Sequence, residues 1–257
     1  VSNNWFIGER LNVLRDYTSA GIITTDGITM RTKDGDRHYT LQEVYDTFGP
    51  SGQGLKWYEG QMAVNDWNND GKINDEDKQI FGCTDPKWTG SLSSTMTYKG
   101  FDFSFMLYTK QGQWSRSYFH EQYMNYGDRG RQKVNFDYYI PAGTPVLDKN
   151  TGDVTYLSEA HIGKYPYPNN TEKTGGGYFS SSSAAVRYHK TSFVKVKNIT
   201  LGYTFPKAWL SKIAVKHLRL YVNVINPFCF TDYEGFDPEW ASANLTNGGP
   251  ASVTYQI

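Results

Sequence analysis

The stretch best suited to chemistry is residues 66–77, which reads DWNNDGKINDED. Its acidic and amide side chains surround Gly71, which suits the sharp turn of a twelve-residue calcium loop. Hard Ca²⁺ prefers oxygen ligands, and the spacing offers four oxygen-bearing side chains and one backbone carbonyl. The predicted metal ligands are Asp66, Asn68, Asp70, Lys72 through its carbonyl, and Asp77.

This calcium loop departs from an EF-hand in two respects. Asp77 stands where EF-hands carry glutamate, and no pair of flanking helices is predicted. We therefore expect Ca²⁺, the predicted cofactor, to stabilise a loop rather than to drive a conformational sensor. A solvated turn rich in Asp and Asn, with no metal, is the open alternative.

A second group of carboxylates, Glu234, Asp237 and Glu239, lies beside Gly235 and Pro238. A glycosidase could use such a pair, but carboxylates beside Gly and Pro more often form turns. The five histidines show no zinc-ligand spacing, and no Gly-x-Ser-x-Gly elbow is present. The sequence predicts no catalytic residue, and we expect that the chain is not an enzyme.

An aromatic run offers a third chemistry, because aromatic rings can stack on sugars. It could equally extend a strand and pack against neighbouring loops, which we consider the better interpretation. The run consists of Trp114, Tyr118, Phe119, Tyr123 and Tyr126.

The elements that must position these residues are mainly strands. Apolar and polar residues alternate with a period of two, which predicts strands with one apolar and one polar face, over residues 92–98, 101–108, 199–205 and 218–224. One short helix is predicted over residues 41–48, with Thr40 as N-cap and Glu43 completing a capping box.

The connections between strands separate two interpretations of this alternation. A soluble β-sandwich would alternate in the same way, but here Lys99–Gly100 and residues 206–216 form short connections, whereas residues 110–192 form a very long one. Short turns at one end and long loops at the other are typical of an outer-membrane β-barrel. The predicted fold class is all-β, as strands of a large antiparallel outer-membrane β-barrel with long extracellular loops.

Composition excludes several classes of protein. The 257 residues carry 26 basic and 26 acidic side chains, which argues against a nucleic-acid binder. An aromatic content of 16% argues against disorder, and no apolar run reaches the ~20 residues of a transmembrane helix. Cys83 and Cys229 are predicted to be unpaired, half-buried thiols.

Four segments resemble one family. They are residues 5–22, the stretch VNDWNNDGKINDEDKQIFG at 64–82, the hairpin YKGFDFS at 98–104, and SFVKVKNITLGYTFP at 192–206 followed by GFDPE at 235–239. Together they are similar to the C-terminal barrel region of SusC/RagA-like TonB-dependent outer-membrane transporters of Bacteroidetes. The similarity is weakest over residues 125–192.

The resemblance implies that residues 1–257 are the C-terminal part of a TonB-dependent receptor barrel, without its plug and N-terminal regions and with an incomplete final strand. It implies nutrient import across the bacterial outer membrane, with oligosaccharide or peptide as cargo. The expected partners are a SusD-like surface lipoprotein, the TonB complex through the absent N-terminal regions, and the lipid bilayer. It also places the acidic loop outside the cell.

In such a barrel, the polar faces of the strands would line the lumen. The residues expected there are Thr200, Thr204, Arg219, Tyr221 and Asn223. The main rival is a secreted, soluble, calcium-stapled β-protein that binds or cleaves glycans. A cell-surface adhesin is a third possibility, but it should show internal repeats, and we find none.

Overall fold

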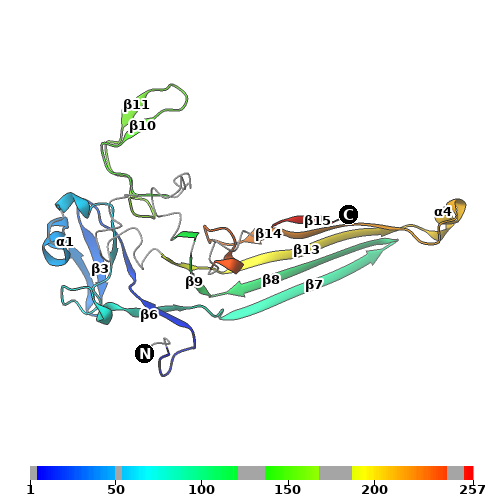
Figure 1. Cartoon of the computed structure of the whole chain (residues 1–257), viewed down its shortest axis with the longest axis horizontal. Helices are drawn as coiled ribbons and strands as arrows, with labels where there is room; N and C mark the ends of the chain where they lie inside the picture. The colour runs from blue at the N-terminus through cyan, green and yellow to red at the C-terminus, as the bar shows by residue number, and fades with distance from the viewer. Residues whose placement is uncertain are drawn as a thin grey trace. The chain divides into compact units, whose positions relative to one another are not determined.

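The computed structural model describes residues 5–49, 54–117, 119–120, 137–167, 187–241 and 252–256. Strands dominate these ranges, and the all-β prediction is confirmed (Figure 1). No helix in the described ranges has both the length and the apolar character needed to cross a lipid bilayer. The chain divides into two compact units, which are described separately.

The first unit comprises residues 1–9, 13–82 and 117–188. Its short strands pair as β1 with β6, β2 with β5, β3 with β4, and β10 with β11. Their bounds are β1 Val13–Asp16, β2 Ser19–Ile22, β3 Ile28–Thr32, β4 Gly35–Tyr39, β5 Met62–Val64, β6 Gln79–Cys83, β10 Pro145–Leu147 and β11 Val154–Tyr156. The helical elements are α1 Leu41–Phe48, η1 Leu55–Trp57 and η2 Asp75–Asp77.

Helix α1 has the predicted bounds and the predicted cap. The Thr40 side chain accepts a hydrogen bond from the Glu43 backbone N–H, and the Glu43 carboxylate accepts one from the Thr40 backbone N–H. Val44 is its buried residue and joins a small core that includes Met30, Tyr39 and Tyr58. Burial of these side chains stabilises this unit.

The second unit comprises residues 10–12, 83–116 and 189–257. It contains a five-stranded antiparallel sheet in the order β15-β14-β13-β8-β7. The strands are β7 Trp88–Tyr98, β8 Phe101–Gln111, β13 Phe193–Thr204, β14 Arg219–Phe230 and β15 Thr254–Gln256. The other elements are β9 Trp114–Arg116, which pairs with β12 Tyr188–Lys190, together with α4 Lys207–Leu210, η4 Ser211–Ile213 and η5 Pro238–Trp240.

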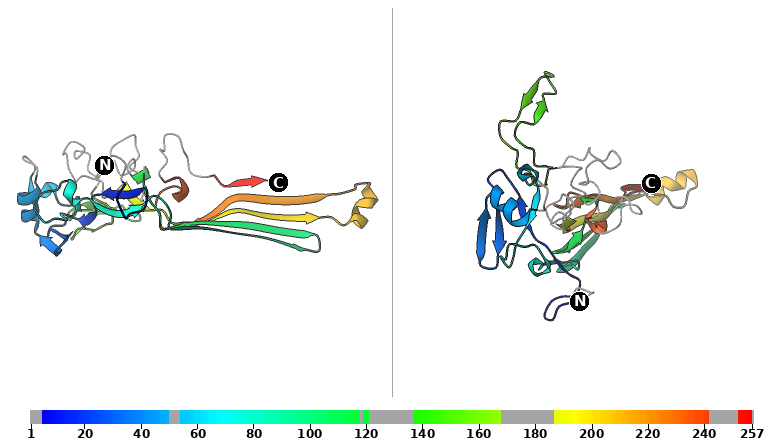
Figure 2. Two further views of the ribbon diagram at one scale, coloured as in Figure 1. Left: turned by 90° about the horizontal axis from the view of Figure 1, so that it is seen from below. Right: turned by 60° about the vertical axis from the view of Figure 1, so that its left-hand side comes forward.

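The four long strands lie side by side, and their two short connections are at the end that carries α4 (Figures 1 and 2). Lys99 and Gly100 form the predicted two-residue turn with positive φ angles of 47° and 89°, as such tight hairpins require. The strands are longer than their alternation predicted, most clearly in β13 and β14.

One irregularity divides β13. The register with both neighbours shifts between Val196 and Asn198. Lys197 is an extra residue relative to β8, and two residues of β14, Asn226 and Pro227, lie opposite it, so β14 has one residue more than β13 there. Asn226 takes a positive φ of 54°. This bulge changes the phase of the alternation, so Lys195 and Asn198, three residues apart, both lie on the polar face.

The long connection over residues 110–192 also contains short strands that the sequence analysis did not predict. Its described part contains β9, β10, β11 and β12. Each of these strands has three residues, which is too short for a period-two pattern to be recognised. The two cysteines are free, as predicted, but Cys83 is buried and Cys229 is exposed.

Candidate functional site

The apolar face of the five-stranded sheet carries many exposed side chains. Cross-strand pairing places its side chains in rows, for example Met96, Phe103, Leu201 and Val222 in one row. Leu201 is 53% exposed and Val222 is 45% exposed. A continuous apolar surface of this extent marks contact with a protein or a lipid.

Aromatic side chains lie at both ends of this face. At the end with the short turns, the Phe101 and Tyr203 ring centroids are 4.5 Å apart, and Tyr98 lies in the same row. At the opposite end of the face are Trp88 and Phe230, which are 56% and 62% exposed. The ten-residue separation of Trp88 from Tyr98 corresponds to about 33 Å along a strand, or ~25 Å at a 40° tilt, which matches the apolar band of a membrane barrel.

The opposite face of the sheet carries a ladder of polar side chains. The Thr200 hydroxyl donates to Asn223 Oδ1 at 2.8 Å, and Asn223 Nδ2 donates to Gln256 Oε1 at 2.9 Å. The register places on this face all five residues that the sequence analysis assigned to it, namely Thr200, Thr204, Arg219, Tyr221 and Asn223.

A salt bridge crosses this polar face near the short turns. Arg219 Nη2 is 2.5 Å from Asp102 Oδ2, and Arg219 Nε is 3.1 Å from Asp102 Oδ1, so the pair is bidentate. It passes over Gly202, where an added Cβ would lie 2.6 Å from both Asp102 carboxylate oxygens. Gly202 thus permits β8 and β14 to be linked across β13.

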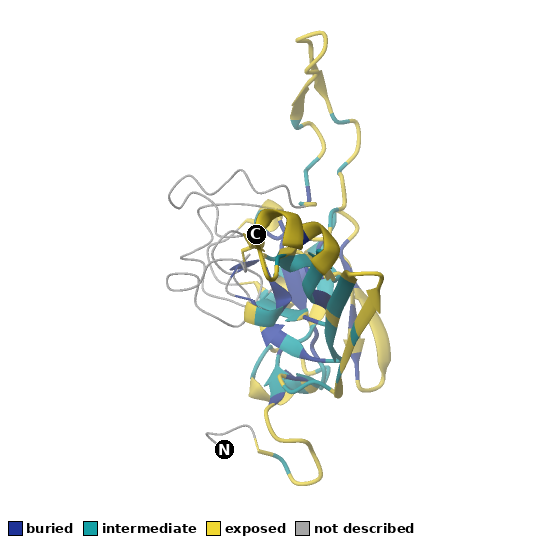
Figure 3. Ribbon diagram, turned by 90° about the vertical axis from the view of Figure 1, so that its right-hand side faces the viewer, coloured by how far each residue is buried: buried dark blue, intermediate teal, exposed yellow. Residues whose placement is uncertain are grey.

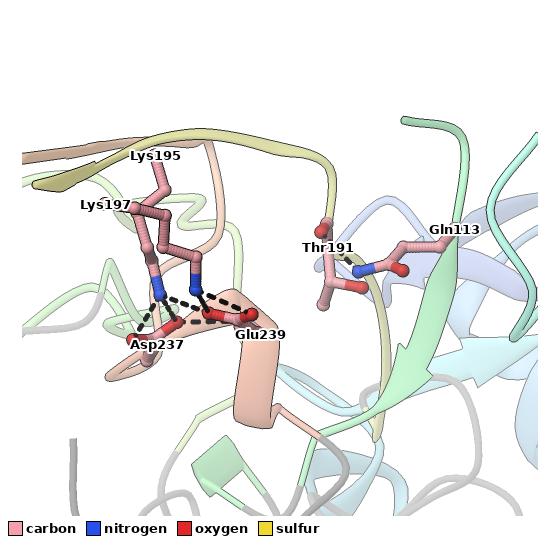
Figure 4. A network of polar contacts seen from close by, with 6 residues as sticks. All are labelled: Gln113, Thr191, Lys195, Lys197, Asp237 and Glu239. Carbon is pink, nitrogen blue, oxygen red and sulfur yellow. Dashed lines mark hydrogen bonds and ion pairs between the residues drawn. The ribbon is translucent and has the colours of Figure 1, made fainter. Parts of the chain in front are cut away.

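A network of two lysines and two carboxylates closes the other end of the polar face (Figure 4). Lys195 Nζ lies 2.8 Å from both oxygens of Asp237 and 2.8 Å from Glu239 Oε2. Lys197 Nζ contacts the two oxygens of Glu239 at 2.9 and 2.7 Å. The Lys195 and Asp237 side chains are only 2% and 9% exposed, whereas those of Lys197 and Glu239 are 30% and 21% exposed. The network therefore holds η5 against the sheet through a buried ion pair and a partly exposed one, with two charges of each sign.

These contacts decide between the two interpretations of the second acidic cluster. Asp237 caps η5 by accepting from the Glu239 backbone N–H at 2.9 Å, as the turn interpretation requires. Burial would raise the pKa of Glu239, but hydrogen bonds from Lys195 and Lys197 outweigh it and hold this pKa below its ordinary value. Glu239 therefore stays ionised and is unsuited to be the protonated acid of a glycosidase.

The acidic loop buries its two outermost predicted ligands. Asp66 and Asp77 are fully buried. Asp77 Oδ1 accepts from the Asn68 backbone N–H at 3.3 Å, and Asp66 Oδ2 accepts from the Gly71 backbone N–H at 2.9 Å. Gly71 has a φ of +77°, which is the turn expected at this position.

The remaining predicted ligands lie nearer the loop surface. Asn68 Nδ2 donates to Asp70 Oδ2 at 3.2 Å and to Glu76 Oε2 at 3.0 Å, and Asp70 Oδ1 accepts from the Lys72 backbone N–H at 2.8 Å. Within the described ranges, no three His, Cys, Asp or Glu side chains are grouped as a metal cluster. An EF-type loop also relies on amide and backbone oxygens.

The predicted aromatic run is only partly described. Trp114 begins β9 and is half-buried, with Lys190 Nζ 5.6 Å from its ring centroid. Phe119 is buried. The positions of Tyr118, Tyr123 and Tyr126 lie outside the described residues. Both described rings are packed, in agreement with the packing interpretation.

A cavity of about 400 Å³ in the first unit was not anticipated from the sequence. Trp57, Tyr139 and Tyr167 supply aromatic walls, and Glu59 and Gln61 supply polar groups. Tyr139 donates to Glu59 Oε1 at 2.6 Å, and burial together with this bond raises the pKa of Tyr139. No sequence signal could have found it, because its walls come from residues about 80 positions apart.

The lysine network was also missed, although a signal existed. Lysines at two-residue spacing in an otherwise apolar strand put two positive charges on one face, and buried lysines need acidic partners. The sequence offered such partners at Asp237 and Glu239.

Known proteins were compared with the chain. No protein-family model matches it. The TonB-dependent receptor SusC of Bacteroides thetaiotaomicron is 29% identical over 221 residues, which cover 85% of this chain. The TonB-dependent receptor P39 of Formosa agariphila is 26% identical over 268 residues, which cover 96% of this chain. The resemblance to SusC/RagA-like TonB-dependent receptors is confirmed.

These receptors are much longer than this chain, which spans 18% of SusC and 24% of P39. Their names are those of receptors rather than of enzymes, in agreement with the expectation from the sequence. A solved structure of the RagAB peptide transporter shares the fold, with a TM-score of 0.50 and 16% identity over 98% of this chain and 23% of that one.

Proposed function

We propose that this chain forms part of the wall and extracellular loops of an outer-membrane β-barrel that imports nutrients. The observation that carries the proposal is the five-stranded sheet, with one exposed apolar face and one hydrogen-bonded polar face. Its four long strands have 11 or 12 residues, which is enough for a tilted strand to cross a bilayer, since ~9–11 residues are needed. The apolar face contacts lipid, and the polar face lines the lumen.

The outer edge of β7 supports the same proposal. In the described part of the chain, β7 pairs only with β8. An open edge cannot face lipid, because unpaired backbone groups in hydrocarbon cost several kcal/mol each. We therefore infer that another strand of the same barrel, outside this sequence, pairs with β7.

The similarity to SusC supports a proposal about partners and cargo. We propose that a SusD-like surface lipoprotein covers the loop side, and that import is driven through TonB by regions outside this sequence. The cargo is an oligosaccharide or a peptide. The cavity with Trp57, Tyr139 and Tyr167 suits either, since aromatic faces stack on sugar rings and on apolar side chains while Glu59 and Gln61 bind polar groups.

A pair of cysteine variants tests which face contacts lipid. Val222 and Tyr221 are adjacent in β14, point to opposite faces, and have similar exposures of 45% and 42%. In the full-length protein in its membrane, with Cys229 replaced by serine, a cysteine at Tyr221 should react with a water-soluble maleimide. A cysteine at Val222 should react only with a lipid-soluble one.

The same pair of cysteine variants distinguishes the barrel from the rival interpretation. In a secreted, soluble glycan-binding protein the two cysteines would react alike with the water-soluble reagent, without detergent. That result would reject the barrel. Reaction of both cysteines after unfolding in denaturant is the control for thiol reactivity.

For the acidic loop we propose a bound calcium ion. Asp66 and Asp77 are fully buried carboxylates, and neither forms an ion pair with a basic side chain of the described residues. Burying an unpaired charge is costly, and a divalent cation held by Asp66, Asn68, Asp70, the Lys72 carbonyl and Asp77 would compensate it.

Calcium should raise the melting temperature of the EDTA-treated full-length protein. At a hundredfold excess over Kd, a site of this kind stabilises the folded state by about 2.7 kcal/mol. Asp66→Ala should remove the response, whereas Asp75→Asn, which alters an exposed carboxylate paired with Lys78, should keep it. Terbium luminescence excited through Trp67 reports binding independently of melting. An unchanged calcium response in Asp66→Ala would place the ion elsewhere.

A further inference from the structure

The connection between β13 and β14 is more than a turn. Residues 206–217 read PKAWLSKIAVKH and contain α4 followed by η4. The coil of α4, nearest the viewer in Figure 3, is coloured as exposed over most of its surface. We call residues 206–217 the basic turn.

The basic turn carries one sign of charge. Its lysines are Lys207, Lys212 and Lys216, all exposed, and it contains no acidic residue. None of the three lysines has an ion pair or side-chain hydrogen bond with another described residue. The other short connection at this end of the sheet also contains a lysine, Lys99, and no acid. Since the whole chain has a net charge of zero, this end of the sheet is locally positive.

The basic turn also exposes large apolar side chains. Trp209 is 60% exposed and Ile213 is 64% exposed, whereas Leu210 is buried at 3%. The turn can therefore bury one apolar residue internally, yet it leaves an indole and a branched aliphatic side chain outside. Trp is the residue most suited to a membrane interface, because one end of its ring is apolar and the other carries an N–H donor.

The position of the basic turn connects it to the apolar face of the sheet. The Phe205 backbone N–H donates to the Leu218 carbonyl at 3.0 Å, which closes the strand pair immediately before the turn. Tyr203 and Leu220, two residues further along the strands, belong to the last row of the apolar face. The exposed Trp209 and Ile213 thus follow directly on the surface that we assign to lipid.

We infer that the basic turn binds the headgroup layer of an acidic phospholipid leaflet at this end of the barrel. This inference rests on the proposed function. Trp209 and Ile213 insert at the boundary between headgroups and acyl chains, and the three lysines extend to the lipid phosphates. Juxtamembrane lysines each favour an anionic surface, so the turn anchors the end of the β13–β14 pair to the leaflet.

Quenching by brominated lipid tests the contact. The full-length protein is placed in nanodiscs that contain either phosphatidylglycerol or phosphatidylcholine with brominated acyl chains, at equal content. The fluorescence of Trp209 is obtained as the difference between the wild-type protein and Trp209→Phe. The difference between wild type and Trp88→Phe reports on the apolar face in the same samples.

Brominated phosphatidylglycerol should quench the fluorescence of Trp209. Its apparent affinity for the basic turn should be at least ~10-fold higher than that of brominated phosphatidylcholine. The variant Lys207→Gln/Lys212→Gln/Lys216→Gln should lose this preference and keep quenching of Trp88. These lysines are exposed and make no described contact, so the variant should fold.

Other outcomes overturn the inference. If Trp88 is quenched and Trp209 is not, or if both lipids quench Trp209 equally in the wild type, the acidic-lipid contact is wrong while the barrel stands. If neither tryptophan is quenched, the proposed barrel itself fails.

Discussion

Replacing Ile199 by arginine should destabilise the protein in a bilayer by about 2–4 kcal/mol. Ile199 lies in the central row of the apolar face, directly opposite Phe105 on β8 and Val224 on β14. At this depth the guanidinium would lie in hydrocarbon, far from either headgroup layer. The measurement is the free energy of unfolding by urea of the full-length protein in lipid nanodiscs, followed by tryptophan fluorescence.

The matched control is Ser104→Arg. Ser104 precedes Phe105 on β8 and pairs with Thr200, so it lies on the polar face at nearly the same height. Its arginine would enter water, and the cost should stay within about 0.5 kcal/mol, as at ordinary surface positions. Equal costs for the two variants would show that both faces have the same surroundings, which contradicts the proposed membrane position.

Removing the buried ammonium group of Lys195 should also lower the stability of the protein strongly. Lys195→Met is expected to cost about 3–5 kcal/mol, because the Asp237 carboxylate would be left buried without its cation. The loss should be local, since Lys195 joins the sheet to the short segment around η5. Amide hydrogen exchange should therefore show weakened protection at Trp240 and Ala241, and little change in the centre of β8.

Two further variants make this test specific. Lys190→Met removes an exposed lysine on β12, beside the Trp114 ring, and should cost at most ~1 kcal/mol. Combining Lys195→Met with Asp237→Leu removes both buried charges, and should recover part of the stability lost in the single variant. Additive losses in the double variant would mean that the two groups are not coupled.

Much of the barrel-like sheet could be predicted from local pattern. The alternation over residues 101–108 and 199–205 identified both strands and both faces, because a period of two directly reflects which side chains share a surface. The capping box of Thr40 and Glu43 likewise located α1, since a cap depends only on residues three apart.

The rest of the fold depends on contacts and register shifts that a local sequence pattern does not reveal. The extension of β13 back to Phe193 was missed, because the bulge at Lys197 reverses the phase and makes Val194, Val196 and Ile199 share a face. The aromatic cavity depends on Tyr139 meeting Glu59, 80 positions away. The acidic loop was recognised by its residue types and spacing, but that pattern did not show that Asp66 and Asp77 are its buried ends and that Asp70 is nearer the surface.

The bulge in β13 also bears on how the strand can vary in length. In a regular strand, one inserted residue would turn every later side chain to the wrong face. Next to Lys197 the backbone already accommodates an unpaired residue, and Asn226–Pro227 provides a matching irregularity on β14. Insertions and deletions among relatives should therefore collect at this point, where one end of the strand can change in length without turning the exposed apolar side chains of the other end to the wrong face.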